Sequence, residues 1–182
     1  MAKQYDHLNK RIQKFIESQK IFFVATAAEG SRINLSPKGM DTFRVLDENR
    51  VIWLNLTGSG NETAAHLAAD SRITMMFCSF EGPPMILRIY GSGKVIHPQD
   101  DAWNDLIGQF PDLAGKRQII DTRVELVQTS CGMSIPFYDF KSERRELDDW
   151  AREKGEEGIK DYWNEKNVKS IDGLPTGIQE GQ

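Results

Sequence analysis

The sequence contains no long apolar run, and this absence bears on where the protein resides. The longest apolar stretches, such as residues 21–25, are far too short to span a bilayer. The first twenty residues carry charges throughout and include no apolar segment of the kind found in a secretory signal. We therefore expect a cytoplasmic protein that does not bind membranes.

Cysteine is scarce, since the chain has only Cys78 and Cys131. The two lie far apart, with no CxxC pair and no cluster of histidines, so the sequence contains neither a disulfide framework nor a metal-binding motif. This usage fits a reducing compartment. We expect both thiols to be inert packing residues, while Cys131, which precedes an aromatic turn, could instead contact a cofactor.

Basic charge is not in excess. The 23 lysine and arginine residues are outnumbered by 27 aspartate and glutamate residues, which gives a net charge of -4. The chain as a whole therefore lacks the excess of positive charge that typically binds a nucleic-acid backbone. Apolar residues make up 39% and charged residues 27% of the chain, and this ordinary globular composition excludes a disordered, collagen-like or disulfide-dense protein.

Short strands separated by turns make up most of the chain. From residue 21 onward, short apolar segments are followed by turn residues, and two longer segments, 85–96 and 117–128, alternate apolar and polar side chains as strands do. Gly91 and Gly93 lie within the first of these and predict a bulge or a sharp bend. The interpretation is a mainly β protein with α additions, namely a six-stranded antiparallel split β-barrel over residues 1–140.

Helical patterns flank the strands. Apolar residues recur at helical spacing over residues 6–19, which predicts an amphipathic helix at the N-terminus. The charge density rises from Lys141, and residues 141–182 are predicted to form a C-terminal helical extension of the same domain. We expect the aromatic side chains of this extension to pack on the barrel or on a partner subunit rather than on a cofactor. Its residues at helical spacing are Leu147, Trp150, Ala151, Ile159, Tyr162 and Trp163.

A glycine-containing loop runs from a predicted buried strand straight into a short helix over residues 56–69. Gly58 and Gly60 allow the backbone to approach a ligand closely, and Ser59 and Glu62 have the spacing of a capping box. Free amides at a helix start attract anions, phosphate above all. Two interpretations stay open, a phosphate site or a capped helix and nothing more. Glu62 would compete with an anion for the positive end of the helix unless its side chain folds back onto the cap.

Lys38 stands in a predicted turn, 36–39, where Pro37 stiffens the backbone. A lysine held at the end of a strand can provide a point charge for a phosphate, and a solvated turn lysine is the alternative. Together the two segments favour a phosphate site more than either does alone, because groups of the loop that face Lys38 would suit a phosphate at the rim of the barrel. The groups of the loop that could do so belong to Ser59, Asn61 and Thr63.

Three segments, in their order and spacing, resemble the pyridoxamine 5'-phosphate oxidase-like split-barrel flavoproteins: FFVATAAEGSRINLSPKG, NRVIWLNLTGSGNETAAHLAADSRITMMF and PPMILRIYGSGKVI. The similarity covers roughly residues 20–130. It implies a homodimer that binds FMN at the subunit interface, with the phosphate held by the second strand and by the loop and helix. On this chain the resemblance implies phosphate contacts from Ser36 and Lys38 on one side and from Thr57, Ser59, Asn61 and Thr63 on the other.

Gly58 from the loop and Arg88 from the predicted strand 85–96 complete the candidate cofactor-binding residues. Arg88 could place positive charge near the pyrimidine edge of a flavin, or it could form an ion pair at an interface. His66, in the middle of the short helix, fits a packed or surface imidazole rather than a catalytic one. No residue is assigned as a catalytic acid, base or nucleophile, and none as a metal ligand.

The chain departs from the oxidases of this family at three places. Glu62 and Thr63 stand where those oxidases carry an arginine–lysine pair, and Ile86 stands where they carry a glutamine. Their substrate motif R-L-H-D-R has no counterpart here. We therefore expect an FMN-binding oxidoreductase with a small-molecule substrate other than pyridoxamine phosphate. The alternatives are a non-catalytic flavin, haem or deazaflavin binding protein, or an interaction protein with an empty barrel.

Overall fold

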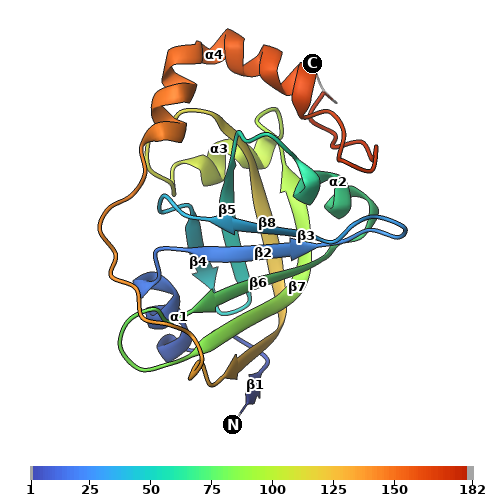
Figure 1. Cartoon of the computed structure of the whole chain (residues 1–182). Helices are drawn as coiled ribbons and strands as arrows, with labels where there is room; N and C mark the ends of the chain where they lie inside the picture. The colour runs from blue at the N-terminus through green and yellow to red at the C-terminus, as the bar shows by residue number, and fades with distance from the viewer. Residues whose placement is uncertain (1, 180–182) are drawn as a thin grey trace.

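An antiparallel sheet of eight strands forms the body of the protein in the computed structural model, which describes residues 2–179 (Figure 1). The strands are β1 (Lys3–Tyr5), β2 (Phe22–Thr26), β3 (Asn34–Lys38), β4 (Phe43–Asp47), β5 (Arg50–Leu56), β6 (Arg72–Cys78), β7 (Ile86–Ile96) and β8 (Lys116–Ser130). The helices are α1 (Lys10–Ser18), α2 (Glu62–Ala69), α3 (Asp101–Ile107) and α4 (Glu146–Lys166). The strand order is β3-β2-β6-β7-β8-β5-β4, and β1 pairs with β8 outside this path.

The number of strands differs from the six predicted, and that expectation was wrong. β1 was missed because its three residues, KQY, are polar and too few to show alternation. It pairs with the C-terminal end of β8, where Lys3 lies opposite Thr129. The mainly β class with helical additions is confirmed.

β3 contains residues that the sequence placed in a turn. Ser36, Pro37 and Lys38 all pair with β2, so the predicted turn at 36–39 is wrong over its first three residues. A proline cannot donate to a sheet ladder and was therefore read as a strand end. β3 is the edge of the sheet, and an edge strand tolerates proline because one of its sides needs no partner.

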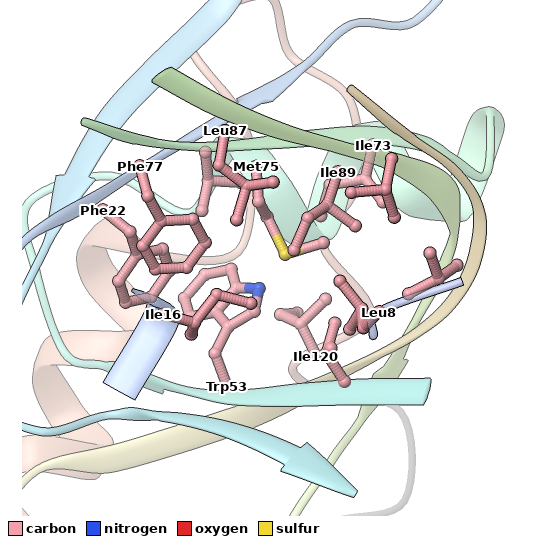
Figure 2. Close-up of a cluster of buried hydrophobic side chains, with 14 of the residues drawn as sticks. Leu8, Ile16, Phe22, Trp53, Ile73, Met75, Phe77, Leu87, Ile89 and Ile120 are labelled. Atoms are coloured by element: carbon pink, nitrogen blue, oxygen red, sulfur yellow. The ribbon is translucent and has the colours of Figure 1, made fainter. Parts of the chain in front are cut away.

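One apolar cluster fills the space that the sheet encloses (Figure 2). Phe22 stacks on Phe77 with ring centroids 5.5 Å apart and meets Trp53 edge to face at 6.1 Å. Trp53 is completely buried, and its indole nitrogen points toward the centre of this cluster (Figure 2). α1 closes one end of the enclosed space by packing Ile12 and Ile16 against the cluster.

α1 begins at Lys10 rather than at residue 6 as predicted. The side chain of Asn9 caps the helix by accepting hydrogen bonds from the amides of Arg11 and Ile12, both at 3.1 Å. Leu8, which the periodicity placed inside the helix, lies before the cap and is fully buried. The N-terminal helix is therefore confirmed, with a later start.

A second apolar cluster lies on the opposite, outer face of the sheet. Successive residues of β5 alternate between the two clusters, since Val51 and Trp53 belong to the inner one while Ile52 and Leu54 belong to the outer one. α3 covers the outer cluster with Leu106. β5 is therefore buried on both faces, which explains its nearly continuous apolar sequence.

Two bulges interrupt the pairing of β8 with its neighbours. The first lies between Tyr90 and Gly91 of β7, as the glycines of this strand predicted. A Cβ atom at Gly91 would lie 2.1 Å from the carbonyl oxygen of Arg123, so only glycine fits there. The second lies opposite Asn55 and Leu56 of β5, where Arg117 is an extra residue in β8.

The C-terminal arm, residues 141–179, passes from α1 along the sheet and over α2 and α3 (Figure 1). α4 is broken at Gly155, whose φ of 67° is left-handed, and the chain continues as an irregular segment after Lys166. Ala151, Ile159 and Ile178 are buried, which confirms that the arm packs on the barrel. Within residues 2–179, no helix is long and apolar enough to cross a membrane.

Candidate functional site

β3 turns its polar side chains toward the inside of the barrel. Lys38 lies opposite the buried Phe22, and Ser36 lies opposite the buried Val24, and directly opposed residues project from the same face of a sheet. Leu35, between them in the alternation, points outward and is 67% exposed. The usual pattern of apolar inside and polar outside is therefore inverted in this strand.

Lys38 is a partly buried cation with few partners. Its Nζ atom lies 3.4 Å from Oδ1 of Asn55 and 5.0 Å from the centre of the Trp53 ring. No acidic side chain of the described residues forms an ion pair with it. Burial, and secondarily the positive charge of Arg117, lowers the pKa of Lys38 to about 8. The solvated turn lysine that the sequence left open is thus excluded.

Arg117 is a second cation in this region, it is buried, and it was not predicted from the sequence. Its side chain is 2% exposed, and burial lowers its pKa to about 9. Nη1 donates to the carbonyl oxygens of Gly58 and Gly60, at 3.5 and 3.0 Å, and to Oδ1 of Asn167 at 2.7 Å. Nε is buried without a partner among the described residues. No local signal in the sequence set it apart, because β8 carries other charged residues along its length.

Hydrogen-bonded side chains extend from Lys38 as far as Gln118, the neighbour of Arg117 in β8. Asn55, whose Oδ1 faces Lys38, donates through Nδ2 to Oε1 of Gln118 at 3.2 Å. Gln118 follows Arg117 in β8, and the bulge at this point makes Arg117 an extra residue beside it. Asn55 and Gln118 are both almost completely buried. The end of the barrel near α2 is therefore polar, in contrast to the apolar cluster at its centre.

The loop between β5 and α2 faces Arg117 and the C-terminal arm. Oγ1 of Thr57 donates to the carbonyl of Gly115 and accepts from Nε1 of Trp163, both at 2.8 Å. The Gly58 carbonyl accepts from Nδ2 of Asn167 at 3.0 Å. These contacts use carbonyl and hydroxyl groups of the loop, so the predicted pocket of loop groups around a phosphate is in large part filled by protein.

The predicted capping box is wrong. α2 is preceded by Asn61, which makes no side-chain cap, and Ser59 is exposed. Oε1 of Glu62 accepts a hydrogen bond from the amide of Ile171 at 3.0 Å instead of folding back onto the cap. Nδ2 of Asn61 donates to the Asn167 carbonyl at 3.4 Å. Hydrogen bonds to the C-terminal arm thus replace the predicted local cap. The start of α2 is covered by a segment distant in the sequence.

Ser36 and Thr63 are brought together through Asn34. Asn34 donates through Nδ2 to Oγ1 of Thr63 at 3.1 Å and of Thr26 at 3.2 Å, and its Oδ1 accepts from Oγ of Ser36 at 2.7 Å. Thr26 in turn contacts Nδ1 of His66 at 3.1 Å. His66 is fully buried, so the packed imidazole is the correct interpretation.

Arg88 lies on the other face of the sheet. It pairs with Met76, which pairs with Phe23, and Phe23 faces away from the inner cluster because its neighbour Phe22 belongs to it. Its Nη1 is 3.3 Å from Oγ of Ser130, and it forms no ion pair with the described residues. The structure therefore does not bring Arg88 together with Lys38.

The two cysteines have different settings. Cys78 is buried, and burial raises the pKa of its thiol, in agreement with a packing role. Cys131 is exposed, so the expectation that it packs is wrong. It begins a segment that cannot bury its apolar side chains, since Met133 and Phe137 are 83% and 80% exposed.

Two hollows lie near the end of the barrel that α1 closes. The first has a volume of about 410 Å³ and is lined by Phe43 and Phe77 with Lys20 and Arg44. The second, of about 1050 Å³, is lined by aromatic residues that include Phe80, Tyr138 and Phe140. Lys20 stands 5.7 Å from the centre of the Phe140 ring and borders both hollows.

The family model described as Pyridoxamine 5'-phosphate oxidase matches residues 8–131. The chain belongs to the pyridoxamine 5'-phosphate oxidase family. Within this family it is similar to the protein ustO of Aspergillus flavus, with 33% identity over 191 residues that cover 94% of this chain and 76% of ustO.

Solved structures share the split-barrel fold of this pyridoxamine 5'-phosphate oxidase family member. HupZ from Group A Streptococcus has a TM-score of 0.50 at 17% identity, over 65% of this chain and 90% of HupZ. An FAD binding protein from Mycobacterium smegmatis has a TM-score of 0.50 at 11% identity, over 68% of this chain and 97% of its own. The split-barrel expectation is thereby confirmed as to fold.

The family's cofactor can be tested against the charges of the site. A phosphate needs donors and positive charge, and Lys38 and Arg117 provide two cations that no described carboxylate neutralises. Thr57 and Asn61 are instead engaged by Trp163 and Asn167. The site fits a phosphate on its cationic side, and it does so with side chains rather than with the amides of the loop.

Proposed function

We propose that this protein binds FMN and is an oxidoreductase that acts on a small molecule. The observation that carries the proposal is the pair of uncompensated cations at the polar end of the barrel, the partly buried Lys38 and the buried Arg117. A buried charge is costly unless an opposite charge accompanies it, and the phosphate of FMN supplies two negative charges. Membership in the pyridoxamine 5'-phosphate oxidase family supports a flavin as the group that carries this phosphate.

The chemistry would come from the flavin, which accepts and donates hydride or single electrons. The chain's own residues would bind and orient it. Lys38 and Arg117 would hold the phosphate, while Ser36, Asn34 and Thr63 form a neutral hydrogen-bonded row beside them. No acid or base is assigned, because none of these groups lines either of the two hollows described above.

Oxidation of pyridoxamine phosphate is not part of the proposal. Glu62 occupies a position that is an arginine in the oxidases that this sequence resembles, and its carboxylate is committed to the amide of Ile171. A carboxylate at this place cannot replace the cation of those oxidases, and their substrate motif R-L-H-D-R has no counterpart in this chain. The substrate is proposed to be another small molecule.

A homodimer with the flavin at the subunit interface is the second part of the proposal. The outward side of β3 exposes Ile33 and Leu35 at 77% and 67%. Ile171 is 73% exposed and lies next to Asp172, whose carboxylate binds the Arg32 amide at 2.8 Å. We call these three side chains the β3 apolar face. A second copy of this chain would remove them from water.

The test is a titration of the purified protein with FMN, followed by flavin fluorescence and by the visible spectrum. We expect saturable quenching, and bleaching of the bound flavin by NADH or NADPH. Binding without bleaching by either donor would favour the non-catalytic flavin carrier. A Soret band in the protein as purified would favour haem, and an unchanged FMN signal would refute flavin binding.

A further inference from the structure

Several donors around Lys38 and Arg117 are left without partners, beside one acceptor, Oδ1 of Asn61. Nε of Arg117 and Nε2 of Gln118 are buried with no hydrogen-bond partner in the part of the chain that the structure describes. Nζ of Lys38 carries three hydrogens and has one oxygen near it, at 3.4 Å. Buried donors without acceptors are rare, because each leaves a desolvated polar group uncompensated.

The acceptors that these residues do have are neutral. Arg117 is held by two backbone carbonyls and by the amide oxygen of Asn167, and Lys38 by the amide oxygen of Asn55. Neutral oxygens orient a cation but do not cancel its charge. An anion with several oxygens would satisfy both the charge and the unpaired donors, as a phosphate monoester does.

We propose that Lys38, Arg117 and Gln118 bind the phosphate group of the flavin, and that Asn167 of the C-terminal arm positions Arg117 for this contact. The inference rests on the proposed function, since it names the residues that select the phosphorylated flavin. It differs from the loop-amide site expected from the sequence, because the phosphate is held by side chains of β3 and β8.

Asn167 is suited to a positioning role. It is completely buried, accepts from Nη1 of Arg117 through Oδ1, and donates through Nδ2 to the Gly58 carbonyl. Its own carbonyl accepts from Oγ1 of Thr176 at 2.6 Å. The side chain therefore fixes one edge of the guanidinium and leaves Nε, at its other edge, without a protein partner.

Comparing FMN with riboflavin isolates the contribution of the phosphate. Dissociation constants for both are measured by fluorescence quenching on wild type, Lys38→Met, Arg117→Lys, Gln118→Met and Asn167→Ala. We expect the preference of the wild type for FMN over riboflavin to fall about tenfold or more in each variant, with riboflavin affinity unchanged. Lys14→Met is the matched control, because Lys14 is exposed on α1, and its preference should equal that of the wild type.

Folding is checked by circular dichroism, so that loss of structure is not mistaken for loss of a ligand contact. An unchanged preference for FMN in folded Lys38→Met and Arg117→Lys would overturn the proposal. So would an equal loss of affinity for FMN and riboflavin, since a merely structural role affects both flavins alike. The Asn167→Ala variant overturns the positioning role alone if its preference for FMN stays that of the wild type.

A wild-type protein that binds neither flavin would refute the proposed function, and inorganic phosphate then decides the anion site. We expect phosphate to raise the melting temperature of wild type and of Lys14→Met, relative to chloride at equal ionic strength, and not that of Lys38→Met. A rise that is equal in all three proteins, or no rise in any, would overturn the anion site as well.

Discussion

Lys38 carries a charge that is costly to the folded protein. It lies inside the barrel against the face of Trp53 and has one amide oxygen within 3.4 Å. A cation over an indole ring gains some stabilisation, but less than water provides. The ordinary pKa of 10.5 is lowered to about 8, which is the measure of this cost.

Replacing Lys38 by methionine should therefore stabilise the protein without ligand near neutral pH. The lowered pKa corresponds to roughly 3 kcal/mol, an upper limit for the gain. Between pH 8 and pH 10.5 the unfolded wild type binds the proton that the folded state has lost, so wild-type stability rises with pH. We expect urea unfolding to show Lys38→Met more stable at pH 7 and its advantage largely gone at pH 10.5. An advantage that stays constant over this range would contradict the setting described for Lys38.

Lys38 could be found from the sequence, whereas Arg117 could not. The lysine stands between proline and glycine in a short motif, so local chemistry sets it apart. Arg117 acquires its setting from a bulge in β8 and from acceptors at Gly58, Gly60 and Asn167. Residues that meet only through tertiary folding leave no local pattern, and a one-residue shift of register reverses which side a strand residue faces.

At the scale of elements, α2 shows how a distant segment overrides a local signal. Ser59 and Glu62 have the spacing of a capping box, and in isolation that would be a sound prediction. In the structure the Ile171 amide donates a hydrogen bond to the Glu62 carboxylate. The side chain of Asn61 donates one to the carbonyl of Asn167. The existence and the position of the helix followed from the sequence, but the partners of its first turn did not.

The bulge opposite Tyr90 and Gly91 of β7 predicts the effect of adding a single methyl group. In Gly91→Ala the added Cβ would overlap the Arg123 carbonyl, so β7 and β8 must separate at their pairing. We expect a loss of about 3 kcal/mol or more in the free energy of unfolding, measured by denaturant titration. Gly108→Ala is the control, because nothing lies within 4 Å of its Cβ position and its φ of -65° suits alanine. Its stability should change by less than about 1 kcal/mol, and equal losses in both variants would contradict this account.

At the scale of the whole molecule, the β3 apolar face predicts association. Leu35 is exposed on the edge strand β3, Ile33 just before it and Ile171 in the C-terminal arm, and exposed edges with apolar residues tend to be covered in the assembled protein. We expect light scattering after size exclusion to give a dimer for wild type and a monomer for Leu35→Glu. Ala68→Glu places the same charge on an exposed position of α2 and should leave the dimer intact. A monomeric wild type, or a dimeric Leu35→Glu, would contradict the assignment of this face.

The attachment of the C-terminal arm predicts how the whole chain unfolds. Hydrogen bonds at several points fasten the arm to the barrel, among them Asp148 to the Ala114 amide, Trp163 to Thr57, and Asn167 to the Gly58 carbonyl. The arm also buries apolar side chains along its length, namely Ala151, Ile159 and Ile178. These contacts are spread over both halves of the arm, so neither half can detach without losing buried surface as well as hydrogen bonds.

We therefore expect residues 141–179 to unfold together with the barrel as one cooperative unit. Native-state hydrogen exchange at increasing urea concentration tests this, with the Asn167 amide, bonded to the Trp163 carbonyl, compared with the Thr57 amide, bonded to the Gly115 carbonyl. Both should reach the same opening free energy and the same dependence on urea, because exchange of either requires global unfolding. A lower opening free energy with weak urea dependence for Asn167 alone would show that the arm detaches first. In that case Asn167 could not hold Arg117 in the folded protein for as long as the barrel itself persists.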